Sequence, residues 1–409
     1  MSNANYSIRN RFCCIFIAIF LYSTGAHVSA LPPDPDNAAL LYYQAFLLLP
    51  DYNLALIDPV LRGAEPNEEV REYIEDAREA IDFAEAAAEI PDCTWGIMYS
   101  QGLGANITQL AQFRYLTFIL SVDALIHATD EDYRTALEKC LTIRRLAEHI
   151  GDDTLVFYLA SINTDVLAQL CIQDILEAMP PDADTLGWLQ GRLVSSQGAP
   201  DSPARALQID FELYLQSMRT NPDYLIQTRE HLAENAENQN TKDEILSLTN
   251  EELIALIVEP YPYYLDLILG VIDCEMPYED KYIEIQRLIS ELNEVLGEIP
   301  GISQPISIYI PNILRIYSIQ VAYKSQLNAI KAAIEIYLEV AQTGQLPESL
   351  PANLPKDPFS SQDFEYEITE EGFILRCQAE DLSLKSAVVR PGDSSSEGVI
   401  HEYEFKVQS

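Results

Sequence analysis

The feature that most constrains this chain is the recurrence of apolar side chains every three or four residues, from about residue 38 to residue 342. The spacing is clearest on one face of 133–147, formed by Tyr133, Ala136, Leu137, Cys140, Ile143 and Ala147. It matches the 3.6-residue turn of an amphipathic helix. Only 16 of the 409 residues are glycine, which argues against an all-β or glycine-loop architecture. The sequence therefore predicts a mainly α fold.

Individual helices are predicted where this spacing lies between start and stop signals. Asn37 caps the first apolar run, Thr129 with Asp132 resembles a capping box before the run 133–147, and Gly151 ends that run. The helices expected are 38–49, 67–90, 107–128, one that starts after Thr129 and ends before Gly151, 153–179, three that start near 183, 203 and 222, 250–274 with a kink or break at Pro260 and Pro262, 278–297, and 312–342. Short connections make helical hairpins without a fixed repeat period. A multi-helix bundle and an irregular helical-hairpin array therefore both remain open.

The pattern changes after Gly344, where strands are expected instead of helices. In "FEYEIT", Phe364, Tyr366 and Ile368 alternate with polar residues and are predicted to point inward, and Glu371–Gly372 supplies a turn. "FILRC" and "GVIHEYEFKV" supply the other strands, and the antiparallel sheet is expected to pack on the long helix around Ile330, Ile334 and Tyr337.

The predicted organisation is a signal peptide (1–30), a helical domain (31–300) with a candidate internal boundary in the polar stretch 233–244, and a small C-terminal α+β unit (312–409).

The N-terminus has the pattern of a secretory signal. Arg9 and Arg11 precede the short apolar run 12–22, and small residues at 28–30 fit a cleavage site before Leu31. We expect an exported protein, periplasmic or secreted, without a stable membrane span after cleavage; an uncleaved anchor is the alternative.

The strongly acidic composition limits the partners that this chain can bind. A net charge of −39 repels nucleic-acid backbones and anionic lipid surfaces, because binding them requires Lys and Arg to displace counterions. We therefore expect no nucleic-acid partner. An envelope protein partner is the expectation that fits an exported helical chain, and a solvated surface explains most of the acidity.

Two resemblances follow from particular segments. The long helix followed by "GQLPESL", "DPF" and "FEYEITEEGFIL" resembles the C-terminal end of type II secretion major pseudopilins, over about 50 residues. That family has a processing site before its N-terminal helix, which this chain lacks, so a role as a pilus subunit is not implied. "NAALLYYQAFLLLPD", "CTWGIMYSQG" and "LAQFRYLTFILSVDALIHA" resemble a family of exported bacterial helical proteins with the same tail. This resemblance implies no activity, substrate or cofactor.

Motifs for catalysis or metal binding are not found. The sequence has no GxSxG, HExxH, GxxxxGK[ST] or GxGxxG segment, and its histidines are scattered, so we expect no cofactor and no metal. Asp182, Asp184 and Gly187 stand at calcium-loop offsets, but a helix cap explains the aspartates better. Of the cysteines beyond the signal segment, Cys140 and Cys171 are expected to be buried thiols on helix faces.

The candidate binding residues are aromatic and lie in two segments. The loop 93–104 combines Cys93, Trp95 and Tyr99 with glycines that give the backbone freedom. The second segment, 259–266, contributes Tyr261, Tyr263 and Tyr264. For both segments the alternative is packing, with Trp95 and Tyr99 filling a gap between helices and the tyrosines belonging to a kinked core helix.

These observations favour a non-catalytic scaffold or binding protein of the cell envelope. The competing class is a helical hydrolase that acts on envelope polymers with a pair of carboxylates, as glycosidases do. No catalytic residue can be chosen among 64 acidic side chains. A hydrolase would hold convergent carboxylates in a deep cleft, at least one with a shifted pKa, whereas a scaffold would present an apolar patch or groove without them.

Overall fold

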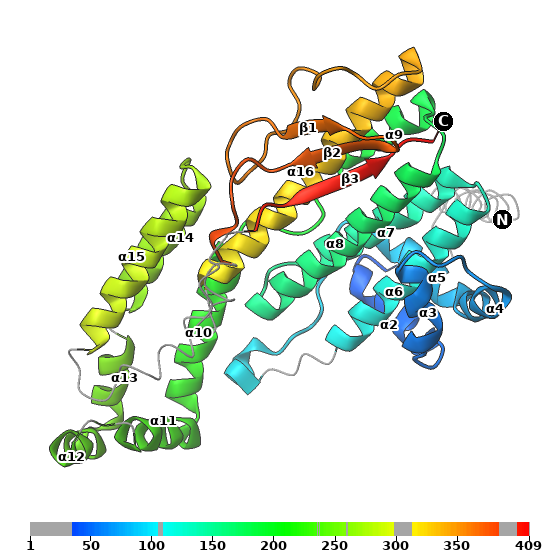
Figure 1. Cartoon of the computed structure of the whole chain (residues 1–409). Coiled ribbons are helices and arrows are strands. Elements are labelled where there is room, and N and C mark those ends of the chain that lie inside the picture. Colours follow the sequence, from blue (N-terminus) through cyan, green and yellow to red (C-terminus); the bar gives the residue numbers. More distant parts are fainter. Residues whose placement is uncertain are drawn as a thin grey trace, which may run out of the picture. The chain divides into compact units, whose positions relative to one another are not determined.

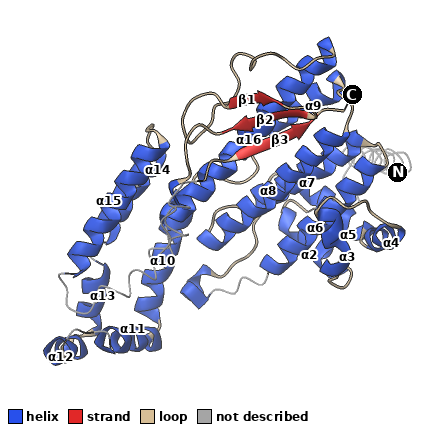
Figure 2. Ribbon diagram, in the orientation of Figure 1, coloured by secondary structure: helices blue, strands red, loops and turns tan. Residues whose placement is uncertain are grey.

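The computed structural model is mainly helical, with a small antiparallel sheet near the C-terminus, which confirms the predicted fold class (Figures 1 and 2). It describes residues 35–104, 109–234, 236, 238–258, 261–297, 313–383 and 399–408. The predicted signal segment 1–30 lies outside these residues. Asn37–Ser409 forms one compact unit.

The elements follow in chain order. The helices are α2 (Ala38–Leu48), α3 (Leu54–Leu61), α4 (Glu68–Asp76), α5 (Arg78–Ala88), the 3₁₀ helix η1 (Tyr99–Gly104), α6 (Leu110–Thr129), α7 (Tyr133–Ile150), α8 (Leu155–Ala178), α9 (Ala183–Ser195), α10 (Ala204–Thr220), α11 (Pro222–Glu234), α12 (Gln239–Ser247), α13 (Asn250–Val258), α14 (Tyr261–Asp273), α15 (Tyr278–Gly297) and α16 (Ile313–Thr343). The strands are β1 (Glu365–Ile368), β2 (Gly372–Arg376) and β3 (Glu402–Lys406).

Several helix starts are fixed by side-chain caps. Asn37 accepts a hydrogen bond from the backbone N–H of Ala39 at the start of α2. Asp132 and Asp182 accept from backbone N–H groups three residues later, and so cap α7 and α9. Because each cap satisfies a backbone donor that has no partner inside the helix, it defines where the helix begins. The prediction that Asp182 is a cap is confirmed. The predicted capping box that starts at Thr129 is wrong, because Thr129 ends α6 and Asp132 itself is the N-cap of α7.

Two predicted helices are interrupted. The stripe over 67–90 belongs to α4 and α5, which meet at Ala77, where ψ is 0°. Because Ala77 stays in the right-handed region, the apolar face continues across this joint. In 250–274, α13 ends at Val258 and α14 begins at Tyr261, with Pro262 inside α14. The expected break at Pro260 lies outside the described residues. Part of the polar stretch 233–244 is helical, because α12 begins at Gln239.

The hairpin of α7 and α8 is central to the packing. One cluster of buried side chains joins this hairpin to α2–α6, and includes Trp95 and Phe113. A second cluster joins the same hairpin to α9–α16 and to the sheet. Helix α8 is long and apolar enough to cross a membrane, but 61% of its most apolar window is buried within the protein. It is therefore placed as a core helix.

The sheet packs against α16 and α8. Its order is β1-β2-β3, with antiparallel pairing that places Phe373 opposite Phe405. The Phe373 ring meets Tyr337 of α16 edge-on, with the ring centroids 5.7 Å apart, as the sequence predicts for this helix. A side chain at Gly372 would put its Cβ 2.0 Å from the Phe405 carbonyl oxygen, so only glycine fits there. The prediction that Ile368 points inward is wrong, because it ends the edge strand β1 and is 48% exposed.

The Asp-Pro-Phe segment before the sheet is a structural turn. The Asp357 carboxylate is buried and accepts hydrogen bonds from the backbone N–H groups of Phe359, Ser360 and Gln378. Phe359 is buried and packs edge-on against Tyr278 at a centroid distance of 4.9 Å. The motif therefore joins the chain after α16 to the helical core.

Candidate functional site

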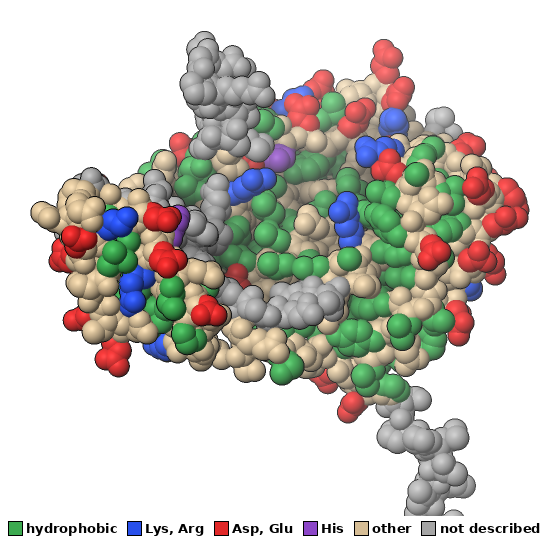
Figure 3. Space-filling view, turned by 90° about the horizontal axis from the view of Figure 1, so that it is seen from below, with side chains coloured by type: hydrophobic (Ala, Val, Ile, Leu, Met, Phe, Trp, Pro, Cys, Tyr) green, Lys and Arg blue, Asp and Glu red, His purple; other side chains and the backbone are tan. Residues whose placement is uncertain are grey.

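A cleft of about 1050 Å³ lies among the described residues. It is bordered by the end of α7 and its connection to α8 (148–153), by the end of α9 and the loop after it (193–201), by one face of α16, and by the Asp-Pro-Phe turn. Its volume is slightly above the range that is usual for ligand pockets, about 300 to 1,000 Å³. On the face shown in Figure 3, acidic side chains spread over the outer parts, whereas several Lys and Arg side chains border a hollow.

Helix α16 contributes one regular face to this cleft. Lys324, Leu327, Asn328 and Lys331 all line it. They stand at positions i, i+3, i+4 and i+7, so they share one side of the helix, and the two lysines begin about 10 Å apart along its axis. The helix is otherwise rich in apolar residues that pack into the core. The cleft therefore has a polar wall on a rigid element.

Most charged groups of the cleft are already paired within the protein. Arg205 contacts Asp152 at 3.3 Å and Asp153 at 2.7 Å. The remaining pairs are Lys324 with Asp201, Lys356 with Asp363, and Glu148 with Arg145. The carboxylate of Asp357 is committed to its own turn. Within the part of the chain that the structure describes, these interactions account for the ionised groups of the cleft except one.

The exception is Lys331. Among the described residues, no carboxylate lies within the 4.0 Å that defines an ion pair with its ammonium group. Burial lowers the pKa of Lys331, and the nearby charge of Arg144 lowers it further. The carboxylates of Asp201 and Asp165, beyond ion-pair distance, offset only part of this, so the charged form is disfavoured. Lys331 is therefore a half-buried cation in the cleft without a counter-ion from the described chain.

A buried ion pair lies beneath the cleft. Arg144 of α7 and Asp165 of α8 are completely buried, and Nε of Arg144 is 3.3 Å from a carboxylate oxygen of Asp165. The Tyr323 hydroxyl donates to Asp165 at 2.6 Å. Gly198 covers the pair with φ of +68°, and a Cβ there would lie 2.4 Å from the Asp165 carboxylate. Only glycine can adopt this positive φ and also leave room for the Asp165 carboxylate. The loop after α9 can therefore pack directly on the ion pair.

Three of the predicted binding residues lie at or beside this cleft. Cys93 and Trp95 line it. Trp95 is mostly buried, stacks on Tyr42, and donates from Nε1 to the His149 carbonyl at 2.7 Å. The Tyr99 hydroxyl donates to Asp153 at 2.8 Å. Burial raises the pKa of the Cys93 thiol to about 12, so this residue is not an activated nucleophile.

The other three predicted residues are on α14 and do not line the cleft. Tyr261 is buried and stacks on Phe211, with centroids 4.3 Å apart. Tyr263 is 65% exposed and meets the partly buried Tyr264 edge-on. The structure therefore brings the 93–99 residues together with the cleft and leaves the three tyrosines elsewhere.

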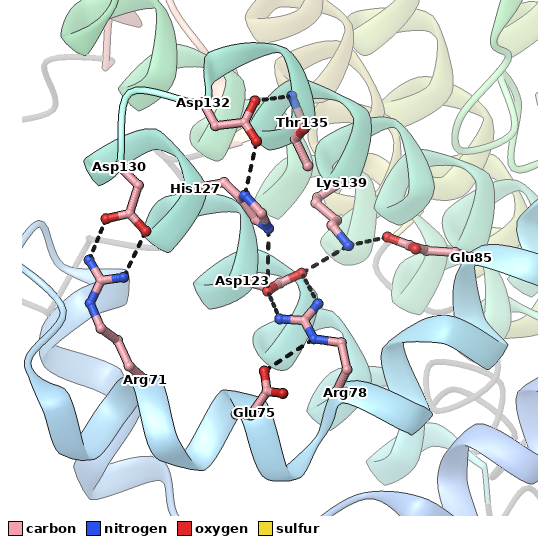
Figure 4. A network of polar contacts seen from close by, with 10 residues as sticks. All are labelled: Arg71, Glu75, Arg78, Glu85, Asp123, His127, Asp130, Asp132, Thr135 and Lys139. Atoms are coloured by element: carbon pink, nitrogen blue, oxygen red, sulfur yellow. Dashed lines mark hydrogen bonds and ion pairs between the residues drawn. The ribbon is translucent and has the colours of Figure 1, made fainter.

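A second group of charges forms the closed network drawn in Figure 4. The Asp123 side chain of α6 is 1% exposed and contacts Arg78 of α5 at 2.9 Å and Lys139 of α7 at 3.1 Å. Lys139 also pairs with Glu85, and His127 lies 4.0 Å from Asp123. A substrate cannot reach a carboxylate that is enclosed in this way. The network therefore joins three helices and is structural.

Residues that matter most in the cleft were missed by sequence reasoning. Lys331, Tyr323 and Gly198 belong to no motif. Arg144 is one of several charged residues of the amphipathic α7, and Asp165 stands in the apolar α8. The available signal was the set of polar residues at helical spacing in the apolar α16, and the charged residues in α7 and α8. Among the described residues, no group of three or more His, Cys, Asp or Glu side chains is arranged to hold a metal.

No protein-family model, curated protein or solved structure matches this chain. The basis for a function is therefore the chemistry of the cleft itself.

Proposed function

We propose that this protein is an exported, non-catalytic binding protein of the cell envelope, and that its ligand occupies the cleft along α16. The observation that carries the proposal is a cleft of about 1050 Å³ on rigid helices whose one unpaired charge is Lys331 among the described residues. Polar groups from several elements converge there with apolar side chains such as Leu327 and Trp95. This combination is typical of small-molecule sites.

Export is the second part of the proposal. It is supported by the N-terminal sequence pattern and by the resemblance to exported helical proteins. N-terminal sequencing of the protein recovered from periplasm and medium tests it. A mature N-terminus at Leu31 is expected, and an intact Met1 in the cytoplasm would contradict export.

Native mass spectrometry tests the binding proposal. The purified protein is incubated with soluble fragments from a digest of envelope polymers, and 1:1 adducts are expected. Leu327→Trp should abolish them, because the larger side chain fills the cleft. Leu170→Trp is the matched control, since Leu170 is 44% exposed on α8 and does not line the cleft. The proposal fails if no adducts form, or if both variants keep them.

A hydrolase remains the second candidate, and Asp152 is the observation that favours it. Burial raises the pKa of Asp152, and Asp153 lies beside it in the same cleft. A carboxyl with a raised pKa suits a general acid. Both carboxylates, however, contact Arg205, which favours their charged forms. In the same spectra, a hydrolase would shorten the fragments with time, and Asp152→Asn would stop this. Adducts of constant mass support binding without catalysis.

A further inference from the structure

The charge of the cleft limits the ligand that it can take. Half-burying a cation without a partner is unfavourable, because water is removed and no carboxylate replaces it. Lys331 is in this position, whereas the other cations of the cleft have partners. A ligand that brings one negative group to Lys331 would complete the missing pair. The Asn328 side chain stands one turn earlier on the same face and already donates to the Lys356 carbonyl at 2.8 Å.

A polyanion does not fit the same surroundings. Glu148, Asp152, Asp153 and Asp201 also line the cleft. Asp152 and Asp153 share the single cation of Arg205, whereas Glu148 pairs with Arg145 and Asp201 with Lys324. Additional negative charge would meet these carboxylates without free cations to balance it. Phosphate groups are usually bound by several cations or by backbone N–H groups at a helix N-terminus. One uncompensated lysine instead matches one carboxylate.

We infer that the cleft recognises a polar ligand bearing a single carboxylate, and that Lys331 binds this group. The inference rests on the proposed function and specifies its ligand class. Carboxylates of this kind occur at peptide C-termini and on acidic sugars, and either source supplies the same contact. The partly exposed apolar side chain of Leu327, on the same face of α16, provides surface for the rest of the ligand.

A pair of probes that differ only in charge tests the inference. Thermal unfolding of the purified protein is followed in N-acetyl-alanine, in its neutral amide, and in inorganic phosphate, at equal ionic strength. A ligand that binds only the folded state raises the melting temperature. We expect N-acetyl-alanine at tens of millimolar to raise it by about 2 °C, and the amide and phosphate to raise it less. Galacturonic acid and its methyl ester form a second arm that distinguishes a sugar source from a peptide source.

Variants connect the response to the lysine. Lys331→Met should lose the carboxylate-dependent rise. Lys281→Met is the control, because Lys281 is another partly buried lysine with a lowered pKa that lies outside the cleft and donates to the Ile272 carbonyl at 2.7 Å. Equal responses in wild type and Lys331→Met overturn the inference, as does a response to phosphate alone or to neither carboxylate. Fragment adducts that survive in Lys331→Met would leave cleft binding standing and remove only the carboxylate assignment.

Discussion

The network around Asp123 and the cleft around Lys331 differ in whether their buried charged side chains have ion-pair partners. In the network, the enclosed Asp123 carboxylate contacts both Arg78 and Lys139, and each ionised group has a partner (Figure 4). In the cleft, Lys331 is half-buried, and no described carboxylate pairs with it. Both sites remove charge from water, but only the network replaces the lost hydration.

This difference separates a structural role from a binding role. Removing a partner from the network leaves a buried charge uncompensated and should destabilise the fold. The unpaired lysine already has that penalty, so the folded protein gains nothing from it unless a ligand arrives. A site that is unfavourable for stability and open to solvent is where a functional role is expected.

The largest expected effect comes from Asp123→Asn, which removes the centre of the network. Lys139 has a side chain that is 9% exposed and would lose this buried counter-ion. We expect a loss of about 3 to 5 kcal/mol in the free energy of unfolding, measured by urea denaturation. Asp130→Asn is the control, because the Arg71–Asp130 pair is exposed and should contribute less than about 1 kcal/mol. Similar losses in the free energy of unfolding of both variants would contradict the claim that the enclosed network stabilises the fold more than an exposed ion pair does.

The ion pair beneath the cleft should behave like the network. Asp165→Leu leaves Arg144 buried without a counter-ion, and we expect a loss of about 3 kcal/mol in the free energy of unfolding by the same measurement. Adding Arg144→Met should restore most of it, because two apolar side chains replace two charges. The Tyr323 hydroxyl still loses its acceptor, at a cost of about 1 kcal/mol. A double variant no more stable than the single one would contradict this account.

Asp210, like Lys331, is a partly buried ionisable residue whose pKa is shifted mainly by burial. Burial raises the pKa of its carboxyl to about 6, and the Leu155 backbone offsets only part of this. Since the folded-state pKa is raised, the protonated form is favoured, and stability falls as pH rises from about 4 through 6. Asp210→Asn should flatten that fall and raise stability at pH 7 by about 2 kcal/mol after allowance for screening. Unfolding curves at several pH values check it, and an unchanged pH profile would contradict it.

Much of the fold was predictable because its signals are local. Asn37 and Asp182 cap helices through atoms a few residues away, so their role is readable from the chain. The joint at Ala77 was not predicted, because the apolar stripe continues across it. Ile368 was misplaced because alternation alone does not show that β1 is an edge strand whose end is uncovered.

The cleft was less predictable because it joins distant segments. Lys331 lies on α16, Gly198 in the loop after α9, and Asp152 in the connection between α7 and α8. These three segments meet only in the folded chain. Composition marked both the aromatic loop and the tyrosine segment as binding candidates, but only the loop lies at the cleft. A cluster such as Tyr261 and Tyr263 does not reveal which face of the helix each tyrosine occupies. The pairing of charges, on which the argument for Lys331 depends, is a property of the fold alone.

The central claim is that Lys139 is held for structure and Lys331 for a ligand. Urea denaturation of Lys139→Met and Lys331→Met, without added ligand, measures this most directly. We predict opposite signs, with Lys139→Met less stable than wild type by about 3 kcal/mol and Lys331→Met equal to it or more stable by up to about 1 kcal/mol. A Lys331→Met variant that loses as much stability as Lys139→Met would contradict the account.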